Sequence, residues 1–102
     1  MPQAMTDEEV REALAGLPGW SAGAAALTKE LSFDGFSAAF AFLTRVALLA
    51  EKRGHHPDFH CSYSRVRLEL RSHDAGGVTA RDVELARAIE ALLPAPARPG
   101  EA

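Results

Sequence analysis

The 102-residue chain has little cysteine, no excess of positive charge and no long hydrophobic run. Cys61 is the only cysteine, which excludes an intrachain disulfide framework and a cysteine-rich zinc site, and makes the cytoplasm the expected compartment. The 11 basic and 14 acidic residues give a net charge of −3, which argues against a nucleic-acid-binding surface. Because no apolar run reaches the ~18 residues of a membrane helix, we expect no membrane association and no signal peptide.

Composition and length indicate one ordinary globular domain. Hydrophobic residues make up 47% of the chain and charged residues 25%, and no internal repeat occurs. We expect a flexible N-terminus over residues 1–5 and a single domain over residues 6–93. Residues 94–102 form a proline-rich stretch that has little to bury, so a disordered tail is expected there.

The first third of the chain predicts a helix followed by a strand hairpin. Thr6 with Glu9 three residues later is a capping-box pattern, and the helix that it begins ends before Pro18. Residues 25–33 alternate between apolar and polar side chains, which predicts a strand with one buried face. A short strand around Trp20 is expected to pair with it.

A strongly apolar helix is predicted over about residues 35–52, with Asp34 as its N-cap and Gly54 as its left-handed C-cap. Its apolar positions form two adjacent stripes: Phe36, Phe40, Leu43, Ala47 and Ala50, and beside them Ala39, Phe42, Val46 and Leu49. A small domain can cover only part of so broad a face. We therefore expect the second stripe to pack against another subunit in a homodimer or homotetramer.

The second half predicts a strand hairpin and a last helix. Two alternating runs, 59–63 and 66–71, are joined closely enough for an antiparallel hairpin, with Phe59, Cys61 and Tyr63 on the buried face. Residues 74–77 form a turn. Thr79 and Asp82 begin a helix that Pro94 ends.

The element order is thus helix-strand-strand-helix-strand-strand-helix. This order predicts an α+β fold: a four-stranded antiparallel sheet with three helices packed on one face.

Histidine is the side chain whose charge changes nearest to neutral pH, so clustered histidines indicate proton transfer or metal binding. His55, His56 and His60 fall within six residues, and His73 is the fourth histidine. Pro57 favours extended backbone at His56, so the His55 and His56 side chains should point apart. His73 continues the polar parity of the preceding strand and is available to a ligand, whereas His60 is expected to be merely exposed.

For each of these residues, a purely structural or surface role competes with a role in a histidine site. Any single histidine is most often a solvated surface residue. A zinc site using Cys61 is disfavoured, because adjacent histidines lack the helical spacing of zinc motifs and Cys61 shares the buried parity. Glu51 is either a solvated charge or a carboxylate that orients a histidine or a ligand amine, and Asp82 is explained by capping alone. Arg81 is interpreted as a surface charge. For Trp20, an anchor in the core is favoured over a flat wall for a ligand.

The chemistry-bearing residues follow the spacing Glu51-x3-His55-His56-Pro57-x5-Tyr63-x9-His73-x8-Asp82. This spacing resembles the signature of the pterin-4a-carbinolamine dehydratases. The similarity extends upstream through Gly19-Trp20, Phe33-Asp34-Gly35-Phe36 and Phe40-x-Phe42-Leu43-Thr44-Arg45-Val46-Ala47, over roughly residues 6–93. The departures are mild: Phe59 replaces a frequent Trp, Gly54 an acid of some members, and Ser72 a frequent Thr.

The resemblance implies a hydro-lyase that removes water from a 4a-hydroxytetrahydropterin to give the quinonoid dihydropterin, as in tetrahydrobiopterin recycling. His55 and His73 would be the acid/base pair, without metal or organic cofactor, and His56 a positioning group. Other residues would orient the histidines or bind the pterin: Glu51, Pro57, Asp82, Trp20 and Ser72.

Two other functions remain open within the same resemblance. Some relatives act as dimerisation cofactors of a homeodomain transcription factor, a role that would use the broad helix stripe. Another pterin, as in a molybdopterin pathway, would use the same pocket. Retention of the three motif histidines favours the enzyme, because a pure scaffold has no physical need for them.

Overall fold

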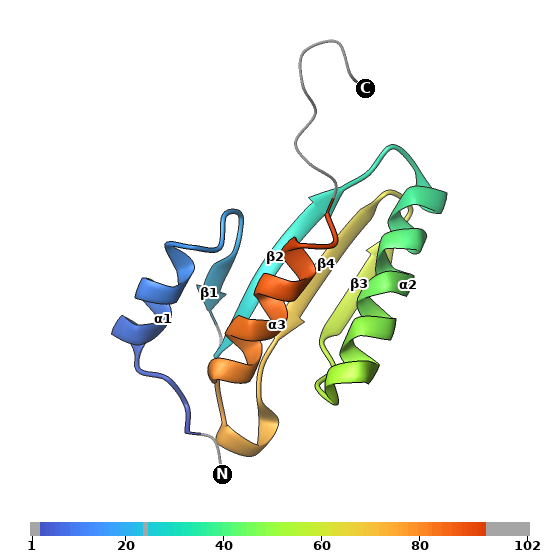
Figure 1. The fold of residues 1–102 in the computed structure, drawn as a ribbon. Helices are drawn as coiled ribbons and strands as arrows, with labels where there is room; N and C mark the ends of the chain where they lie inside the picture. Colours follow the sequence, from blue (N-terminus) through green and yellow to red (C-terminus); the bar gives the residue numbers. More distant parts are fainter. Residues whose placement is uncertain (1–2, 24, 94–102) are drawn as a thin grey trace.

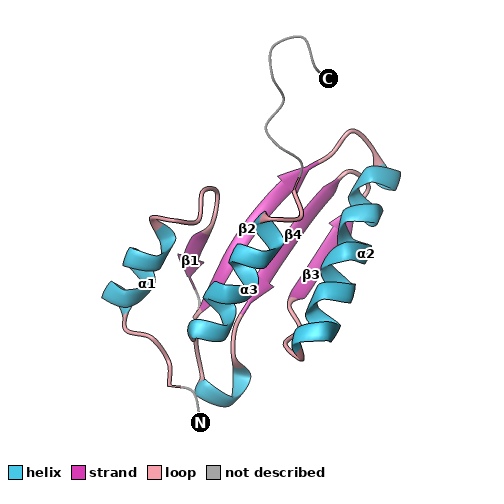
Figure 2. Ribbon diagram, in the orientation of Figure 1, coloured by secondary structure: helices cyan, strands magenta, loops and turns pink. Residues whose placement is uncertain are grey.

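The elements of the computed structural model, which describes residues 3–23 and 25–93, follow the predicted order (Figures 1 and 2). They are α1 (Asp7–Leu14), β1 (Ser21–Gly23), β2 (Ala26–Ser32), α2 (Phe36–Arg53), β3 (Asp58–Ser62), β4 (Arg65–Leu70), the short 3-10 helix η1 (His73–Ala75) and α3 (Ala80–Glu90). The predicted α+β class is confirmed.

The four strands form one antiparallel sheet in the order β1-β2-β4-β3. Helices α2 and α3 lie across one face of the sheet, and α1 lies beside β1 (Figure 1). This order makes β1 and β3 the edge strands and puts β4 in the interior. The register aligns Thr28 of β2 and Asp58 of β3 with Glu69 of β4, so these three residues form a row across the sheet.

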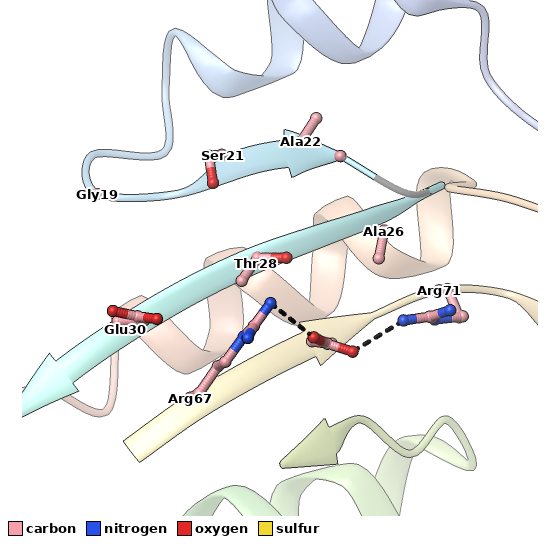
Figure 3. A pocket seen from close by; sticks show the side chains of 10 residues that line it. Gly19, Ser21, Ala22, Ala26, Thr28, Glu30, Arg67 and Arg71 are labelled. Atoms are coloured by element: carbon pink, nitrogen blue, oxygen red, sulfur yellow. Dashed lines mark hydrogen bonds and ion pairs between the residues drawn. The ribbon is translucent and has the colours of Figure 1, made fainter. Parts of the chain in front are cut away.

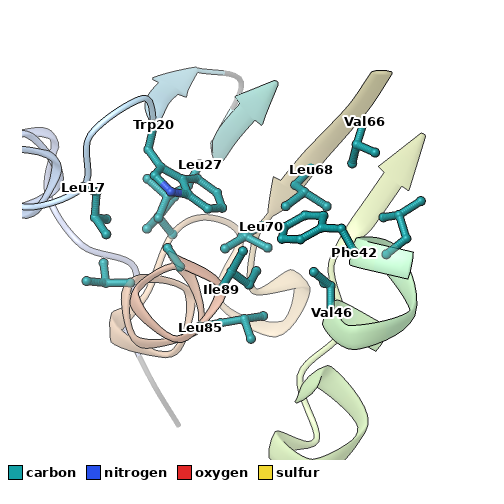
Figure 4. Packing of buried hydrophobic residues seen from close by; sticks show 14 of the residues in the cluster. Leu17, Trp20, Leu27, Phe42, Val46, Val66, Leu68, Leu70, Leu85 and Ile89 are labelled. Carbon is teal, nitrogen blue, oxygen red and sulfur yellow. The ribbon is translucent and has the colours of Figure 1, made fainter. Parts of the chain in front are cut away.

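The core lies between the sheet and the helices, and the alternation of β4 defines its floor. Val66, Leu68 and Leu70 are buried under the helices, whereas Arg65 and Arg67 are exposed on the outer face. Figure 4 shows these side chains against buried residues of α2 and α3, with a third contribution from the α1 end of the molecule. The labelled residues of that picture are Leu17, Trp20, Leu27, Phe42, Val46, Val66, Leu68, Leu70, Leu85 and Ile89.

The predicted caps of the helices are confirmed with one exception. Thr6 and Thr79 each form a capping box, and Gly54 closes α2 with a φ of 66° in the left-handed region. Asp34 is not the N-cap of α2: Gly35 occupies that position without a side-chain hydrogen bond. Just before Asp34, the Phe33 N–H donates to the Ser64 carbonyl and fixes the chain there. Asp34 therefore lies in the bend that precedes α2 and not at the start of the helix.

The predicted burial of Phe59 and Tyr63 is wrong. Phe59 is 45% exposed and Tyr63 71% exposed. Because β3 is an edge strand, Phe59 has a neighbouring strand on one side only. Tyr63 lies beyond the end of β3 in the hairpin turn, with a φ of 54°, so the strand parity no longer applies to it.

Helix α2 separates its apolar residues into a buried and an exposed set. The buried residues are Ala39, Phe42, Leu43, Val46 and Ala50. The prediction that the second stripe packs against another subunit is therefore wrong, because Ala39, Phe42 and Val46 lie in the core of the same chain, under the helix. Phe36, Phe40 and Leu48 are exposed, and the first two rings lie 5.6 Å apart between centroids. We call these three residues, together with Phe59 and Tyr63, the exposed apolar set.

The ends of the predicted domain lie partly outside the described residues. This applies to Pro94 and the predicted disordered tail 94–102, and α3 itself ends earlier, at Glu90. Within the predicted flexible segment 1–5, the Met5 N–H donates to the Val78 carbonyl at 2.7 Å. Among residues 3–23 and 25–93, no helix combines the length and apolarity needed to span a membrane.

We expect Leu68→Ala to lower the free energy of unfolding by about 3 kcal/mol, because it leaves a cavity under two helices at the centre of the sheet. Arg65→Ala, on the exposed face of the same strand, should change it by less than about 0.5 kcal/mol. Urea unfolding followed by circular dichroism measures both. Equal losses would contradict the assignment of β4 faces.

Candidate active site

Antiparallel pairing of β3 and β4 brings the predicted histidines together. Asp58, the first residue of β3, pairs with Glu69 near the end of β4. The loop that precedes β3 therefore lies beside the turn that follows β4. The left-handed Gly54 turns the chain out of α2 into this loop, so His55 and His56 face the segment that carries His73.

A pocket of about 480 Å³ lies at this junction, within the range of roughly 300–1,000 Å³ that small-molecule sites occupy. It is lined by Gly54, His55, His56, Pro57, Asp58, Arg71, Ser72, His73, Asp74 and Arg81. The pocket thus joins five of the predicted site residues. His60 lies elsewhere, in a hollow on the outer face of the sheet with Glu30 and Arg65.

Asp82 lies behind His55 and is 0% exposed. Its Oδ1 atom is 2.5 Å from His55 Nε2, and its Oδ2 atom accepts hydrogen bonds from the Ser72 hydroxyl and the Thr79 N–H, both at 2.9 Å. Asp82 is therefore the N3 residue of a capping box and the partner of a pocket histidine at once. Capping alone, the interpretation from sequence, accounts for only one of its oxygens.

The proton directions in this network follow from the number of donors. Ser72 has one hydroxyl proton and gives it to Asp82, so the Thr79 hydroxyl, 2.8 Å away, donates to Ser72. Thr79 in turn accepts from the Arg81 N–H. The His55 tautomer that fits a carboxylate acceptor at this contact carries its proton on Nε2, which leaves Nδ1 as the nitrogen for a ligand.

His56 bonds a different carboxylate. Its Nε2 atom is 2.8 Å from Glu51 Oε1, and both side chains are exposed. The adjacent rings of His55 and His56 thus have separate partners, as their predicted divergence requires. An exposed pair of this kind adds little stability, so its effect is mainly to orient the ring.

His73 is exposed, but not because it continues the strand. β4 ends at Leu70, Ser72 is buried and bridges to Gly77, and His73 begins the 3-10 helix η1. His73 is thus exposed as predicted, but the reason given for it, that it continues the alternation of the strand, is wrong. Within the described residues His73 makes no side-chain hydrogen bond, so its ring can turn toward a ligand or water.

Two arginines that the motif does not include line the pocket. Arg81, predicted to be a plain surface charge, lies 2.5 Å from Asp74 through its Nη2 atom. The hydrogen bond from Arg81 is the main cause that lowers the pKa of the Asp74 carboxyl, so Asp74 stays ionised at neutral pH and is no proton donor. Arg71 continues the polar alternation of β4, and this pattern could have predicted its position on the outer face of the sheet.

Trp20 is not in this pocket. It is buried, and its Nε1 atom donates to Glu90 at 3.1 Å. It lines a hollow of about 700 Å³ between α1 and the β1–β2 hairpin. The structure therefore agrees with the core interpretation and does not bring Trp20 to the histidines as a wall for a ligand.

Among residues 3–23 and 25–93, no group of three or more His, Cys, Asp and Glu side chains is placed to hold a metal ion. Each of His55 and His56 instead has its own carboxylate partner. The arrangement can hold imidazoles in fixed orientations at the wall of a pocket that is open to water.

Comparison with known proteins shows which family the chain belongs to. The family model of pterin 4 alpha carbinolamine dehydratase matches residues 3–92. A curated protein of Rhodopseudomonas palustris (strain BisB18), named as a candidate pterin-4-alpha-carbinolamine dehydratase, is 50% identical over 94 residues, which cover 90% of this chain and 93% of that protein. A similarly named protein of Rhizorhabdus wittichii is 52% identical over 90 residues, 86% of this chain and 93% of its own length.

Two solved structures share the fold. A transcriptional coactivator/pterin dehydratase from Brucella melitensis has a TM-score of 0.85 and 39% identity, over 90% of this chain and 100% of its own. A pterin dehydratase-like RuBisCO assembly factor of the alpha-carboxysome has a TM-score of 0.59 at 23% identity, over 72% of this chain and 84% of its own, which shows the fold alone. The chain belongs to the pterin-4-alpha-carbinolamine dehydratase family, whose name denotes a hydro-lyase.

We expect Asp82→Ala to lower the free energy of unfolding by about 3 kcal/mol, because it removes a helix cap and leaves buried donors without an acceptor. It should also abolish the slowly exchanging Nε2 proton signal of His55 in NMR spectra recorded in water. Glu84→Ala, an exposed acid on the same helix, is the matched control. If both variants lose the same stability and keep the signal, the network is not as described.

Proposed function

We propose that this protein dehydrates a 4a-hydroxytetrahydropterin to the quinonoid dihydropterin, with His55 and His73 as the acid/base pair. The observation that carries the proposal is that His55, His56 and His73, which come from the two ends of a strand hairpin, line one pocket. Family membership supports the reaction class. The proposed setting is tetrahydrobiopterin recycling in the cytoplasm, with no metal and no organic cofactor.

The reaction needs one proton delivered and one removed. The C4a–O bond breaks as the hydroxyl group takes a proton and leaves as water. The electron pair of the N5–H bond forms the C4a=N5 double bond, and a base takes the N5 proton. Imidazole suits both transfers near pH 7, because neutral and protonated forms are both populated.

The two proposed catalytic histidines have opposite surroundings, which suits a pair that must be reset after each turnover. His55 is largely buried, with 13% of its side chain exposed, and is oriented by Asp82. His73 is exposed and exchanges protons with water directly. The proton that one histidine gains and the other loses is thus restored through solvent. His56, held by Glu51, and Pro57 would position the pterin.

We expect His73→Ala to lower kcat by at least about 100-fold, the lower end of general acid–base contributions. The exposed position of His73 predicts an unchanged melting temperature for the variant. His60→Ala is the control, since His60 is also exposed but lies outside the pocket. The assay follows quinonoid dihydropterin formation from the carbinolamine.

A wild-type protein that does not accelerate dehydration would refute the proposed function. Normal rates in His73→Ala, with an active wild type, would refute only the role of His73.

A second proposal is that the protein is a homo-oligomer that buries the exposed apolar set. Phe36, Phe40 and Leu48 lie on α2, and Phe59 and Tyr63 on the adjacent hairpin. Large apolar side chains gathered on one part of a surface favour association. The similar protein described as a transcriptional coactivator/pterin dehydratase supports a second candidate function for this surface, which is binding of a different protein. The fold leaves the surface separate from the lining of the pocket.

We expect size-exclusion chromatography with light scattering to give the wild type twice or four times the monomer mass. The double variant Phe40→Ser with Leu48→Ser should run as a monomer, because it puts hydroxyls in place of exposed apolar groups. Glu12→Ser, on α1 at the opposite edge of the sheet, should leave the mass unchanged. A monomeric wild type would contradict the proposal.

A further inference from the structure

Arg71 lines two hollows at once. One is the histidine pocket, and the other is a hollow of about 630 Å³ on the outer face of the sheet (Figure 3). The second hollow is lined by Gly19, Ser21, Ala22, Gly23, Ala26, Thr28, Glu30, Arg67, Glu69 and Arg71. Small residues of the β1–β2 hairpin open this space, so the polar side chains of β2 and β4 stand at its floor.

The strand register makes the two hollows neighbours. Asp58, in the histidine pocket, pairs directly with Glu69, in the outer hollow, and Glu69 pairs on its other side with Thr28. Opposite residues in antiparallel strands have Cβ atoms about 5 Å apart. Arg71 stands two residues beyond Glu69 on the same face, at the boundary between the spaces. A ligand that fills the histidine pocket thus reaches the outer hollow by passing Arg71.

Arg71 has donors to offer such a ligand. Its Nη2 atom is 2.8 Å from Glu69 Oε1, and the Nη2 atom of Arg67 is 3.0 Å from Glu69 Oε2. Dashed lines mark the ion pairs made by the two labelled arginines in Figure 3. The nearest contact with Asp58, at 3.9 Å, is too long for a hydrogen bond. A guanidinium group carries five N–H donors. One Nη2 proton is used by Glu69 and the Nε atom is buried, so the remaining Nη protons can donate to oxygen acceptors of a ligand.

The charges of the outer hollow indicate which acceptors fit. Arg67 and Arg71 are balanced there by Glu30 and Glu69, and Asp58 adds a further carboxylate beside Arg71. An anionic ligand group would meet these carboxylates at short range and be repelled. A neutral hydroxyl group can accept a hydrogen bond from an arginine and donate one to a glutamate, so it is compatible with both the cationic and the anionic side chains of the hollow.

We propose that Arg71 is a specificity-determining residue that binds a neutral, hydroxylated substituent of the substrate, which extends from the ring in the histidine pocket into the outer hollow. This inference rests on the proposed function for the identity of the ring. It assigns the outer hollow to the substrate side chain and disfavours a phosphorylated pterin.

The test compares three 4a-hydroxytetrahydropterins that carry a methyl group, a dihydroxypropyl chain or the phosphate ester of that chain. We expect the wild type to have its lowest KM for the dihydroxypropyl substrate. Arg71→Met should raise that KM about tenfold, the worth of a charged hydrogen bond, with kcat nearly unchanged. The KM for the methyl substrate should rise much less, because that substrate has no group that reaches the outer hollow. Arg71→Lys should restore part of the difference.

Two further variants separate this role from a general effect on charge or folding. Arg65→Met removes an exposed arginine of β4 that lines neither hollow, and all its constants should equal those of the wild type. Thr28→Val removes a hydroxyl that lines the outer hollow, and it should raise the KM of the dihydroxypropyl substrate without changing that of the methyl substrate. Equal effects of Arg71→Met on the methyl and dihydroxypropyl substrates, or a preference of the wild type for the phosphate ester, would overturn the proposal.

A binding measurement keeps this test independent of catalysis. Calorimetric titration with stable oxidised pterins that carry the same three side chains should give the same order of affinities and the same loss in Arg71→Met. An inactive wild type that still shows this order would refute the dehydratase proposal and keep the assignment of Arg71. An active wild type that shows no such order of affinities would refute the assignment of Arg71 and keep the dehydratase proposal.

Discussion

The Asp82 carboxylate is fully buried, and a buried anion is stable only where donors replace the water that it has lost. Its donors come from separate segments: His55 from the loop after α2, Ser72 from the end of β4 and Thr79 from the start of α3. The hydrogen bonds that begin α3 therefore also orient a pocket histidine. Loss of this carboxylate would disturb the helix and the site together, so the stability of the fold and the geometry of the pocket depend on one interaction.

Local periodicity predicted the elements well because it depends on near neighbours along the chain. The alternation of Val66, Leu68 and Leu70 with polar residues, and the capping box of Thr79, needed no distant contact. Phe59 and Tyr63 show the limit of this reasoning. Parity tells which face of the sheet a residue occupies, whereas burial depends on strand order and on what lies over the strand. These are long-range properties that spacing does not contain.

The same limit applies to the site. Motif spacing identified His55, His56, His73 and Asp82, and hairpin pairing explains how the first three reach one pocket. Ser72, expected to orient the histidines or bind the pterin, lines the pocket, and its hydroxyl donates to Asp82. The bridge to Gly77, which turns the chain after β4 ends, is a contact that motif spacing does not describe. Thr79 was identified as a cap and is also the second hydroxyl of the network. Alternation along β4 accounts for the outer-face position of Arg71, whereas its place in the pocket, like that of Arg81, depends on tertiary contacts.

The loop that carries His55 and His56 is ordered from one side only. Asp82 holds His55 from the interior, while His56 and its partner Glu51 are exposed at the end of α2. The loop is also anchored at both ends by α2 and β3, the elements that carry most of the exposed apolar set. A partner subunit covering that set would restrain both anchors without contacting the histidines. Assembly would then act on catalysis through the rigidity of this loop. In a monomer, His55 would be held by the Asp82 network and by the hydrogen bond from its backbone N–H to the Ala50 carbonyl at the end of α2.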